Sequence, residues 1–288
     1  MLAPERQRHI LHELEQREAV RVSELSAALG VSEMTVRRDI ETLHAAGSLR
    51  KIHGGARRLG TFGAFEPGFA AKSGQQQAAK AAIAGAALAL VRPGMTISVS
   101  AGTTTHQLAG LLGNVGNLTV VTNSLKAADA IYRLQAEGGA TGSSVIITGG
   151  ERTPSEALVG PVATASIRRL HTDLCFMGVH GLHLECGLTT PNLAEAETNT
   201  VLAAGADQLV VLADHTKFGI SSLAKIAPLA QVDTLVTDDG LATAAQGIYA
   251  EQVGELIVAD IPAATLSDRQ PAVDTAPLAG RSPADQPT

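Results

Sequence analysis

The sequence predicts an α/β domain, with a mostly parallel sheet covered by helices on both faces, preceded by a small winged helix-turn-helix domain. From residue 75 onward, short aliphatic segments alternate with segments of helical periodicity, which is typical of such a sheet. Before residue 60, two short helical segments meet around Gly30 and precede a glycine turn at Gly54-Gly55. We therefore divide the chain into a helix-turn-helix domain (1–58), a linker (59–75), an α/β domain (76–260) and a disordered, proline-rich tail (261–288).

The composition fits a chain with two domains and an aliphatic core. Of the 288 residues 45% are hydrophobic but only 2% are aromatic. No run of eighteen apolar residues occurs and the N-terminus is charged, so neither a membrane span nor a signal peptide is predicted. Cys175 and Cys186 are the only cysteines, which favours a reduced, cytoplasmic protein without disulfides.

The charge is distributed unevenly. Residues 1–60 hold ten Lys and Arg against eight Asp and Glu, a local charge of +2, whereas the remainder holds twelve against twenty, a charge of −8. Four basic residues and no acidic residue lie between Thr42 and Phe65. A basic segment on an acidic body indicates that the segment binds nucleic acid while the body is repelled from it.

The first elements are predicted from periodicity and caps. Pro4 suits the first position of a helix, and an extended segment spans Val20 to Val22. Ser23 can cap a short helix that ends near Leu29. A second helix, the recognition helix, is then capped by Ser32, spans about 33–46 and is stopped by Gly47.

The recognition helix has a clear apolar face. Val36, Ile40 and Leu43 lie at i, i+4 and i+7 and should pack inward. Met34 and Arg38 then point away from the core, as Ala45 does, with Thr35 and Arg37 on the flanks. Leu49 to His53, followed by the glycine pair, predicts the hairpin of a wing.

The segment from Leu59 to Gly74 lacks periodicity but contains Phe62, Phe65 and Phe69, so we expect it to dock partly through these rings. In the α/β part the predicted helices are 78–91, 106–112, 125–137, 159–170 and 195–204. The predicted strands are 96–100, 118–122, 145–148, 174–179, 209–212, 234–237 and 255–259.

The candidate DNA-binding residues lie on the recognition helix and the wing. We expect Thr35, Arg37 and Arg38 to reach base edges, and the wing cations to hold phosphates. The full set is Ser32, Glu33, Thr35, Arg37, Arg38, Arg50, Lys51, His53, Arg57 and Arg58. An exposed, solvated helix face is the alternative interpretation of the two adjacent arginines.

A second set of polar residues follows the predicted strands, whose carboxyl ends bind ligands in open α/β sheets. This candidate ligand set is Ser100, Gly102, Thr103, Thr104, Thr105, Asn123, Ser124, Gly149, Gly150, His180, Gly181, Glu195 and Lys217. Glycine, hydroxyl groups and main-chain N–H groups at a helix start suit a phosphate, with Lys217 as its cation. The hydroxyls and Asn123 suit a sugar. The open alternatives are a capped turn for the threonines, a strand exit for Gly149-Gly150 and a solvated charge for Lys217.

Metal and catalytic sites are not predicted. His180, His183 and Cys186 are spaced by three, but Gly181 and Gly187 bracket them in a loop and no fourth ligand is evident. No GxSxG, GxxxxGK[ST] or HExxH motif occurs. For an isomerase, Glu195 is the best candidate base, although it could equally bind a hydroxyl. We expect no cofactor.

The stretch from Val31 to Ala56, with Arg37-Arg38-Asp39 and His53-Gly54-Gly55-Ala56, resembles the DeoR family of bacterial transcriptional regulators. The resemblance runs from Glu5 to about Gly240. It implies that the α/β part is a sensor domain similar in fold to ribose-phosphate isomerases and CoA transferases, with phosphorylated sugars as the usual effectors. The matching motifs are Gly102-Thr103-Thr104-Thr105, Thr122-Asn123-Ser124, Gly149-Gly150, Gly187-Leu188-Thr189-Thr190 and Lys217-Phe218-Gly219.

Two positions depart from the family. Ser100 stands where the family often has Asp, and His180-Gly181 stands where it often has Asp-Gly. Both changes remove carboxylates that would bind sugar hydroxyls or transfer protons, which argues against catalysis and alters the ligand chemistry, because His can donate as well as accept.

The leading hypothesis is a DNA-binding repressor of carbohydrate-metabolism genes that a phosphorylated sugar or related metabolite releases from double-stranded operator DNA. We expect a dimer or larger homo-oligomer, because one helix-turn-helix reads only a half-site. Switching is expected to act through the Phe62 to Phe69 segment, since it joins the two functions. The alternatives are a sugar-phosphate isomerase-like enzyme with a nucleic-acid-binding arm, and a constitutive DNA-binding protein with an empty pocket.

Overall fold

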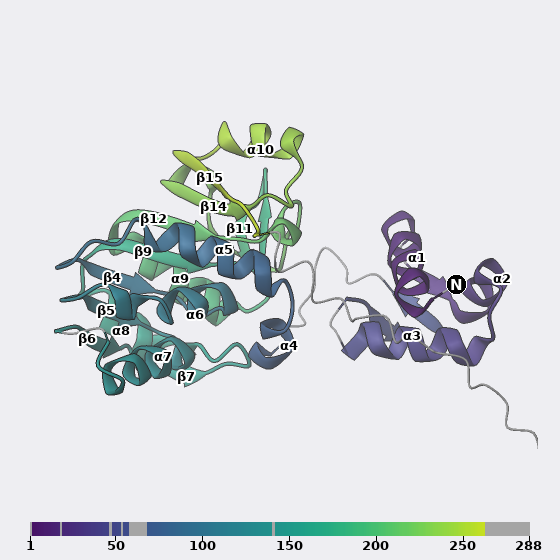
Figure 1. Ribbon diagram of the computed structural model, residues 1–288, viewed down its shortest axis with the longest axis horizontal. Helices are drawn as coiled ribbons and strands as arrows, with labels where there is room; N and C mark the ends of the chain where they lie inside the picture. Colours follow the sequence, from purple (N-terminus) through teal and green to yellow (C-terminus); the bar gives the residue numbers. More distant parts are fainter. Residues whose placement is uncertain are drawn as a thin grey trace, which may run out of the picture.

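A computed structural model describes residues 2–17, 19–45, 48–52, 54–57, 68–139 and 142–262 (Figure 1). The predicted tail from residue 263 and the predicted linker up to residue 67, with Phe62 and Phe65, lie outside the described residues. So do Gly47, His53 and Arg58, as well as the side chains of Arg50 and Arg57.

The N-terminal domain combines three helices with a small antiparallel sheet. The helices are α1 (Ala3–Gln16), α2 (Val22–Leu29) and α3 (Glu33–Ala45), and the strands are β1 (Ala19–Arg21), β2 (Arg50–Ile52) and β3 (Gly55–Arg57). The sheet order is β1-β3-β2, so the predicted extended segment at Val20 pairs with the wing. A Cβ on Gly55 would lie 2.1 Å from the Val20 carbonyl oxygen, and only glycine allows this approach.

The turn between α2 and α3 is fixed by local hydrogen bonds. Gly30 has a φ of 64°, the left-handed conformation that commonly ends a helix. Ser32 accepts a hydrogen bond at its Oγ from the Thr35 N–H at 3.2 Å, as expected of a cap. Ser23 does not cap α2, because that helix begins at Val22 with Arg21 as its N-cap residue.

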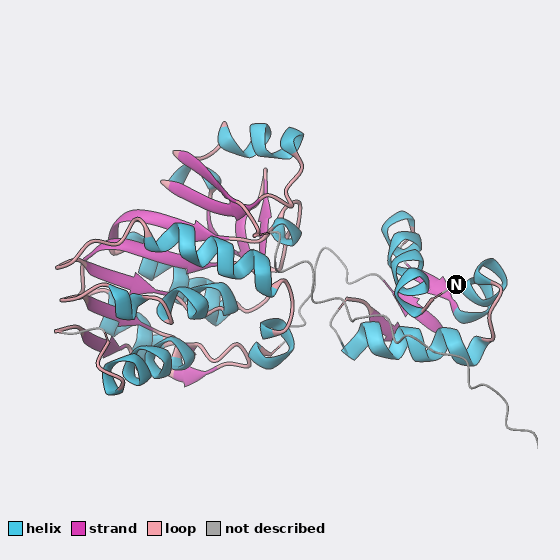
Figure 2. Ribbon diagram, viewed as in Figure 1, coloured by secondary structure: helices cyan, strands magenta, loops and turns pink. Residues whose placement is uncertain are grey.

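The second domain is built on a seven-stranded, wholly parallel sheet in the order β15-β14-β12-β9-β4-β5-β6. The strands are β4 (Thr96–Val99), β5 (Thr119–Thr122), β6 (Ser144–Ile147), β9 (Thr172–Gly178), β12 (Ala206–Leu212), β14 (Thr234–Asp238) and β15 (Glu255–Ala259). The helices are α5 (Gln77–Leu88), α6 (Thr103–Ala109), α7 (Leu125–Ala136), α8 (Pro161–Ile167), α9 (Leu193–Ala204) and α10 (Thr243–Ala250). Figure 2 shows helices on both faces of this sheet.

Side chains that alternate along the central strands pack into two separate hydrophobic cores, one on each face of the sheet. In β9, Leu174 and Phe176 pack with α5, α6 and α7, whereas Cys175 and Met177 pack with α8 and α9. Both cores are almost entirely aliphatic, since only Phe176 in one and Tyr249 in the other are fully enclosed aromatic residues. The low aromatic content therefore does not prevent close packing on either face.

Short elements complete the second domain and were not predicted from the sequence. They are α4 (Phe69–Ser73), β7 (Glu151–Arg152), β8 (Leu158–Val159), β10 (Gly181–His183), β11 (Gly187–Thr190) and β13 (Ala224–Ala227). Three short 3₁₀ helices, Leu112–Asn114, His215–Lys217 and Leu229–Gln231, lie in connections. Strands β10, β11 and β13 form a separate antiparallel sheet, so the predicted loop around His183 is a hairpin.

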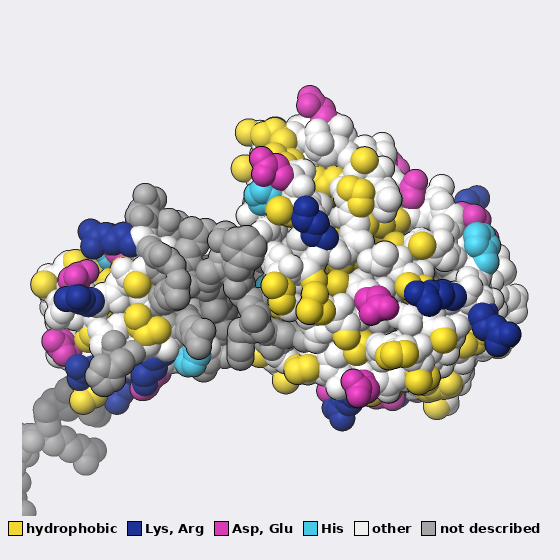
Figure 3. Space-filling view, turned by 180° about the vertical axis from the view of Figure 1, so that it is seen from behind, with side chains coloured by type: hydrophobic (Ala, Val, Ile, Leu, Met, Phe, Trp, Pro, Cys, Tyr) yellow, Lys and Arg dark blue, Asp and Glu magenta, His cyan; other side chains and the backbone are white. Residues whose placement is uncertain are grey.

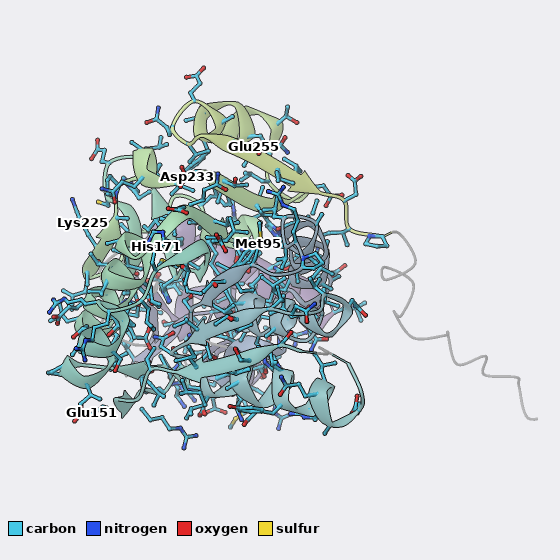
Figure 4. All side chains as sticks on the ribbon, turned by 90° about the vertical axis from the view of Figure 1, so that its left-hand side faces the viewer. Met95, Glu151, His171, Lys225, Asp233 and Glu255 are labelled. Atoms are coloured by element: carbon cyan, nitrogen blue, oxygen red, sulfur yellow. The ribbon has the colours of Figure 1, made fainter. Side chains whose placement is uncertain are left out.

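The amino ends and the carboxyl ends of the parallel strands lie on opposite sides of the sheet. Met95, His171, Asp233 and Glu255 mark the amino ends of four strands and face the viewer in Figure 4. The carboxyl ends lie at the opposite edge, where the predicted ligand residues gather. Among the described residues, no helix has the length and apolar character needed to span a membrane.

Candidate functional site

A cleft opens at the carboxyl edge of the parallel sheet. It is lined by Lys72, Ala101, Gly102, Thr103, Thr104, Ser155, Gly178, Val179, His180, Thr190, Pro191, Glu195, Asn199, Leu212, Ala213, Asp214 and Lys217. The ends of β4, β9 and β12 form its floor, while α4, α6 and α9 supply side chains around it. Six of the predicted ligand residues, Gly102, Thr103, Thr104, His180, Glu195 and Lys217, therefore lie together on its wall.

The cationic side of the cleft contains lysines from three elements. Lys72 and Lys217 line it, and the Lys72 ammonium donates a hydrogen bond to Ser155 Oγ at 2.9 Å. Behind Lys72, the buried Lys80 donates to the Lys72 main-chain carbonyl at 2.6 Å. Burial lowers the pKa of Lys80 to about 8, even though the nearby Asp214 carboxylate opposes this shift. The arrangement suits an anionic ligand.

Two carboxylates, Glu195 and Asp214, also line the cleft. Glu195 accepts a hydrogen bond from Thr153 Oγ1 at 2.6 Å and lies 3.5 Å from the Thr190 hydroxyl. Asp214 accepts from the Thr216 N–H at 3.1 Å and also from the Thr216 hydroxyl. Both carboxylates are thus held in place at the cleft wall by hydroxyl donors, and carboxylate oxygens held in this way can accept hydrogen bonds from ligand hydroxyls.

Two buried polar side chains in the cleft have no partner in the described part of the chain. Asn199 and Thr104 are each only 7% exposed, and neither side chain has a hydrogen bond there. Their polar atoms are not fully enclosed, because among the described residues only Thr237 Oγ1 is both enclosed and without a partner. Because both side chains line the cleft, a polar ligand would satisfy them.

The remaining predicted ligand residues lie behind the cleft wall. Ser100 accepts a hydrogen bond from the Gly178 N–H at 3.0 Å, and Thr105 donates to the Gly102 carbonyl at 3.1 Å. Asn123 accepts from the Ala101 N–H at 3.0 Å and donates to the Leu158 carbonyl at 3.3 Å. Ser124 caps α7 by accepting from the Ala127 N–H at 3.1 Å. These side chains position the strand ends.

The predicted glycines outside the wall have a similar role. A Cβ on Gly150 would lie 2.4 Å from the Val159 carbonyl oxygen, and one on Gly181 would lie 2.4 Å from the Ile220 carbonyl oxygen. Gly149 has a φ of 74°, which places it in the left-handed region. All three therefore permit close backbone turns beside the site.

Five polar wall residues stand outside the predicted ligand set: Lys72, Ser155, Thr190, Asn199 and Asp214. Thr190 nevertheless belongs to a motif of the family resemblance. Asp214 comes shortly after the last residue of β12, and Asn199 lies one helical turn after Glu195, so both carried a signal. Lys72 and Ser155 carried none, because they lie in stretches without periodicity. They come together only through the tertiary fold.

The recognition helix α3 has a distinct outward face. Val36 and Ile40 are at most 1% exposed, whereas Met34 is 67% exposed and Arg38 is also exposed. Glu33 and Ser32 are exposed, and Thr35 is half-buried with its hydroxyl 2.9 Å from Ser32 Oγ. The predicted base-reading residues Arg37 and Arg38 are therefore accessible in the structure.

Three acidic residues accompany these cations. The Arg37 guanidinium lies 2.7 Å from a Glu33 oxygen, and the Lys51 ammonium of β2 lies 2.5 Å from Glu41 Oε1. Asp39 differs from both, because it is 4% exposed and receives a hydrogen bond of 2.7 Å from Arg6 Nε of α1. Asp39 therefore ties α3 to α1, whereas Glu33 and Glu41 remain at the surface.

We find no metal site in the described ranges, because no group of three His, Cys, Asp or Glu side chains there could hold a metal ion. His183 instead accepts the Glu185 N–H at 3.2 Å within the hairpin. Burial raises the pKa of the Cys175 thiol to about 11, so this thiol is not a nucleophile at neutral pH.

Comparison with protein families gives two matches. Residues 6–61 match the DeoR-like helix-turn-helix domain, and residues 75–239 match the DeoR C terminal sensor domain. The chain is 38% identical over 236 residues to the HTH-type transcriptional regulator GolR of Listeria innocua, covering 82% of this chain and 90% of that protein.

Two other relatives are similar over nearly the same span. The HTH-type transcriptional regulator GlpR of Haloferax volcanii is 35% identical over 84% of this chain and 92% of its own length. The transcriptional repressor AccR of Agrobacterium fabrum is 31% identical over 89% of this chain and 97% of its own length.

Solved structures resemble the chain more distantly. A ribose 5-phosphate isomerase from Methanocaldococcus jannaschii is 17% identical with a TM-score of 0.34, covering 48% of this chain and 53% of that chain. The eIF2B delta subunit from Chaetomium thermophilum is 16% identical with a TM-score of 0.35, covering 50% and 49% respectively. Neither similarity is strong enough to bear on function.

Proposed function

Because the chain belongs to the DeoR family of transcriptional regulators, we propose that it is a repressor released from operator DNA by a phosphorylated sugar or a related metabolite bound in the cleft. The observation that carries the effector proposal is the composition of the cleft. Two lysines, two carboxylates and the polar side chains of Asn199 and Thr104 converge there.

The effector class follows from this chemistry. Lys72 and Lys217 provide charge for a phosphate, while Glu195 and Asp214 provide acceptors for hydroxyl groups. Asn199 both donates and accepts, so it can bind a hydroxyl or a phosphate oxygen. An apolar ligand would leave Asn199 and Thr104 unsatisfied and is therefore disfavoured.

The DNA-binding role rests on the N-terminal domain. Its recognition helix presents Arg37 and Arg38, and the wing carries Lys51. Phosphate contacts would position the domain and the helix would read bases in the major groove. A dimer or larger assembly is proposed for the same reason as before, since one domain covers a single half-site.

Coupling between the two domains is proposed to run through α4, which lies within the predicted linker of residues 59–75. The Phe69 N–H donates to the Pro154 carbonyl at 3.0 Å, and the Phe69 ring meets the His106 ring edge-on with centroids 5.4 Å apart. The next turn brings Lys72 to the cleft. A ligand that draws Lys72 from Ser155 would therefore shift the end of the segment that leads to the DNA-binding domain.

The alternative of a sugar-phosphate isomerase does not hold, because the similar full-length relatives are transcriptional regulators. The third possibility, a regulator with an empty pocket, is tested directly by the panel of sugar phosphates described below. We also propose a cytoplasmic location, because the proposed partner is operator DNA.

The test uses purified protein with duplexes from its own promoter region and a panel of sugar phosphates. Salt-sensitive duplex binding that a panel member weakens, with a rise in thermal stability from the same compound, is expected. Absence of salt-sensitive binding would refute the DNA-binding role. Binding that no panel member alters would refute the effector class.

A further inference from the structure

The acidic residues of α3 have two different environments. Asp39 is buried against Arg6 and holds the helix in the domain. The Glu41 side chain is 58% exposed and that of its partner Lys51 is 46% exposed, although their charged atoms are only 2.5 Å apart. Exposed pairs of this kind contribute little to stability. The Glu41–Lys51 pair can therefore separate at little cost to the stability of the domain.

Glu41 lies on the face of α3 that points away from the core. Successive residues turn by about 100°, so Met34, Arg38 and Glu41 fall at i, i+4 and i+7 on one stripe. This stripe is opposite Val36 and Leu43, which are buried. Figure 3 shows acidic and basic side chains interspersed over the described surface of the N-terminal domain. The face proposed to meet DNA therefore carries a carboxylate in the C-terminal part of α3.

We propose that Glu41 is a specificity-determining residue that weakens binding to arbitrary DNA and favours sites with a cytosine in its reach. The inference rests on the proposed function, because it requires the outward face of α3 to enter the major groove. Nothing in the family matches or in the relatives' names assigns a role to this residue.

The weaker binding to arbitrary DNA follows from the Glu41–Lys51 ion pair. For Lys51 to hold a phosphate, its ammonium must leave the Glu41 carboxylate or share its charge with it. The carboxylate then lies close to the negatively charged DNA, and like charges brought together oppose association. Arg38 also attracts Glu41, and together Lys51 and Arg38 lower the pKa of Glu41, so the carboxylate stays ionised at neutral pH.

The preference for cytosine comes from the hydrogen-bonding groups that bases present in the major groove. A carboxylate accepts hydrogen bonds, and in the major groove the N4 amino group of cytosine is the donor that Glu and Asp contact. Adenine also donates there, but its neighbouring N7 is an acceptor that repels a carboxylate. The Glu41 carboxylate repels DNA of every sequence. Only a site with a cytosine within its reach offsets this repulsion by a hydrogen bond.

The test compares wild type with Glu41→Gln, which keeps the shape but removes the charge. Each protein is titrated with one duplex of arbitrary sequence and is used to select duplexes from a pool with a randomised centre. The variant should bind the arbitrary duplex about five-fold more tightly at low salt, because one repulsive charge is gone. Its selected sequences should change from cytosine toward adenine at one position, because Gln both donates and accepts.

Glu24→Gln is the matched control, since it removes an exposed carboxylate of α2 that pairs with Arg17, at 3.6 Å, rather than with the wing. A second control places Glu41→Gln in a Lys51→Ala background, where the gain on the arbitrary duplex should persist, because the carboxylate repels DNA even without its lysine partner. A gain no larger than that of Glu24→Gln, or an unchanged base preference, overturns the inference. Failure of the wild type to bind any duplex would instead overturn the proposed function.

Discussion

The buried ammonium of Lys80 donates a hydrogen bond of 2.6 Å to the main-chain carbonyl of Lys72, a residue that lines the candidate cleft. Lys80 is 3% exposed and belongs to α5. This bond fixes α4, a helix of five residues that could not be stable alone, against the body of the sensor domain. The position of Lys72 thus depends on a charge that has been removed from water.

The first prediction concerns pH. Burial lowers the pKa of Lys80 from 10.5 to about 8, so between these values the unfolded chain binds more protons than the folded chain. The contribution of Lys80 to stability therefore rises with pH, from its lowest value below pH 8 to its full value above pH 10.5. Compared with Lys80→Met, the wild type should gain up to about 3 kcal/mol from pH 7 to pH 10.5 in denaturant unfolding. Equal pH dependence in both proteins would contradict the burial of a charged Lys80.

The second prediction concerns Lys72. Lys72→Met removes the ammonium that meets Ser155 but keeps the main-chain carbonyl to which Lys80 donates. We expect the variant to fold and to bind promoter duplexes like the wild type, while the sugar phosphate that releases the wild type no longer releases it. Duplex affinity with and without that compound measures the effect. Normal release would exclude Lys72 from coupling.

The third prediction concerns the Asn199 amide. Asn199→Leu replaces an amide that lines the cleft, without a hydrogen bond in the described part of the chain, by an apolar group of similar volume. The ligand-free protein should therefore lose little stability. The shift in Tm caused by an effector should fall, because the ligand loses a hydrogen bond worth about 1 kcal/mol, or roughly five-fold in affinity. Gln208→Ala, at the exposed amino end of β12, is the control. A full effector shift in Asn199→Leu would place the ligand elsewhere.

The fourth prediction concerns Lys51. If Lys51 contacts a phosphate, Lys51→Ala should weaken binding to all duplexes alike and reduce the slope of log affinity against log salt by about 1. Lys225→Ala removes an exposed lysine of β13 (labelled in Figure 4) and should leave the slope unchanged. If both variants behave alike, the change reflects net charge and Lys51 touches no phosphate.

The fifth prediction concerns Asp39. Asp39→Ala leaves the Arg6 guanidinium without the carboxylate at 2.7 Å and frees α3 from α1. The N-terminal domain should lose about 5 °C or more in Tm, while the sensor domain is unaffected. Hydrogen exchange of α1 and α3 amides measures this locally. Unchanged exchange there would show that apolar packing alone holds the two helices together.

Much of the fold could be predicted from the sequence because its main elements are strongly periodic. The strand Glu255–Ala259 and the helix beginning at Leu125 agree with their predicted limits, since each is bounded by turn residues or a cap. The short strands β10, β11 and β13 could not be predicted. Segments of three or four residues have no measurable period, and their pairing depends on distant parts of the chain.

Part of the candidate site could also be predicted from the sequence. Glycine and hydroxyl residues at strand ends indicated the cleft, and Thr104, Glu195 and Lys217 lie on its wall. The pattern could not separate these from Ser100 and Asn123, which follow the same strands but bond to the backbone behind the wall. One residue of difference in a strand reverses the direction of its side chain, and the end of a strand is the least predictable boundary.

Phe176 and Met177 are neighbours in β9, yet they belong to the two cores on opposite faces of the sheet. If either layer of helices detached, it would expose one face of β9, whose other face packs against the remaining layer. The sensor domain is thus expected to melt in one cooperative transition. A metabolite bound at its edge would therefore protect helices on both faces equally.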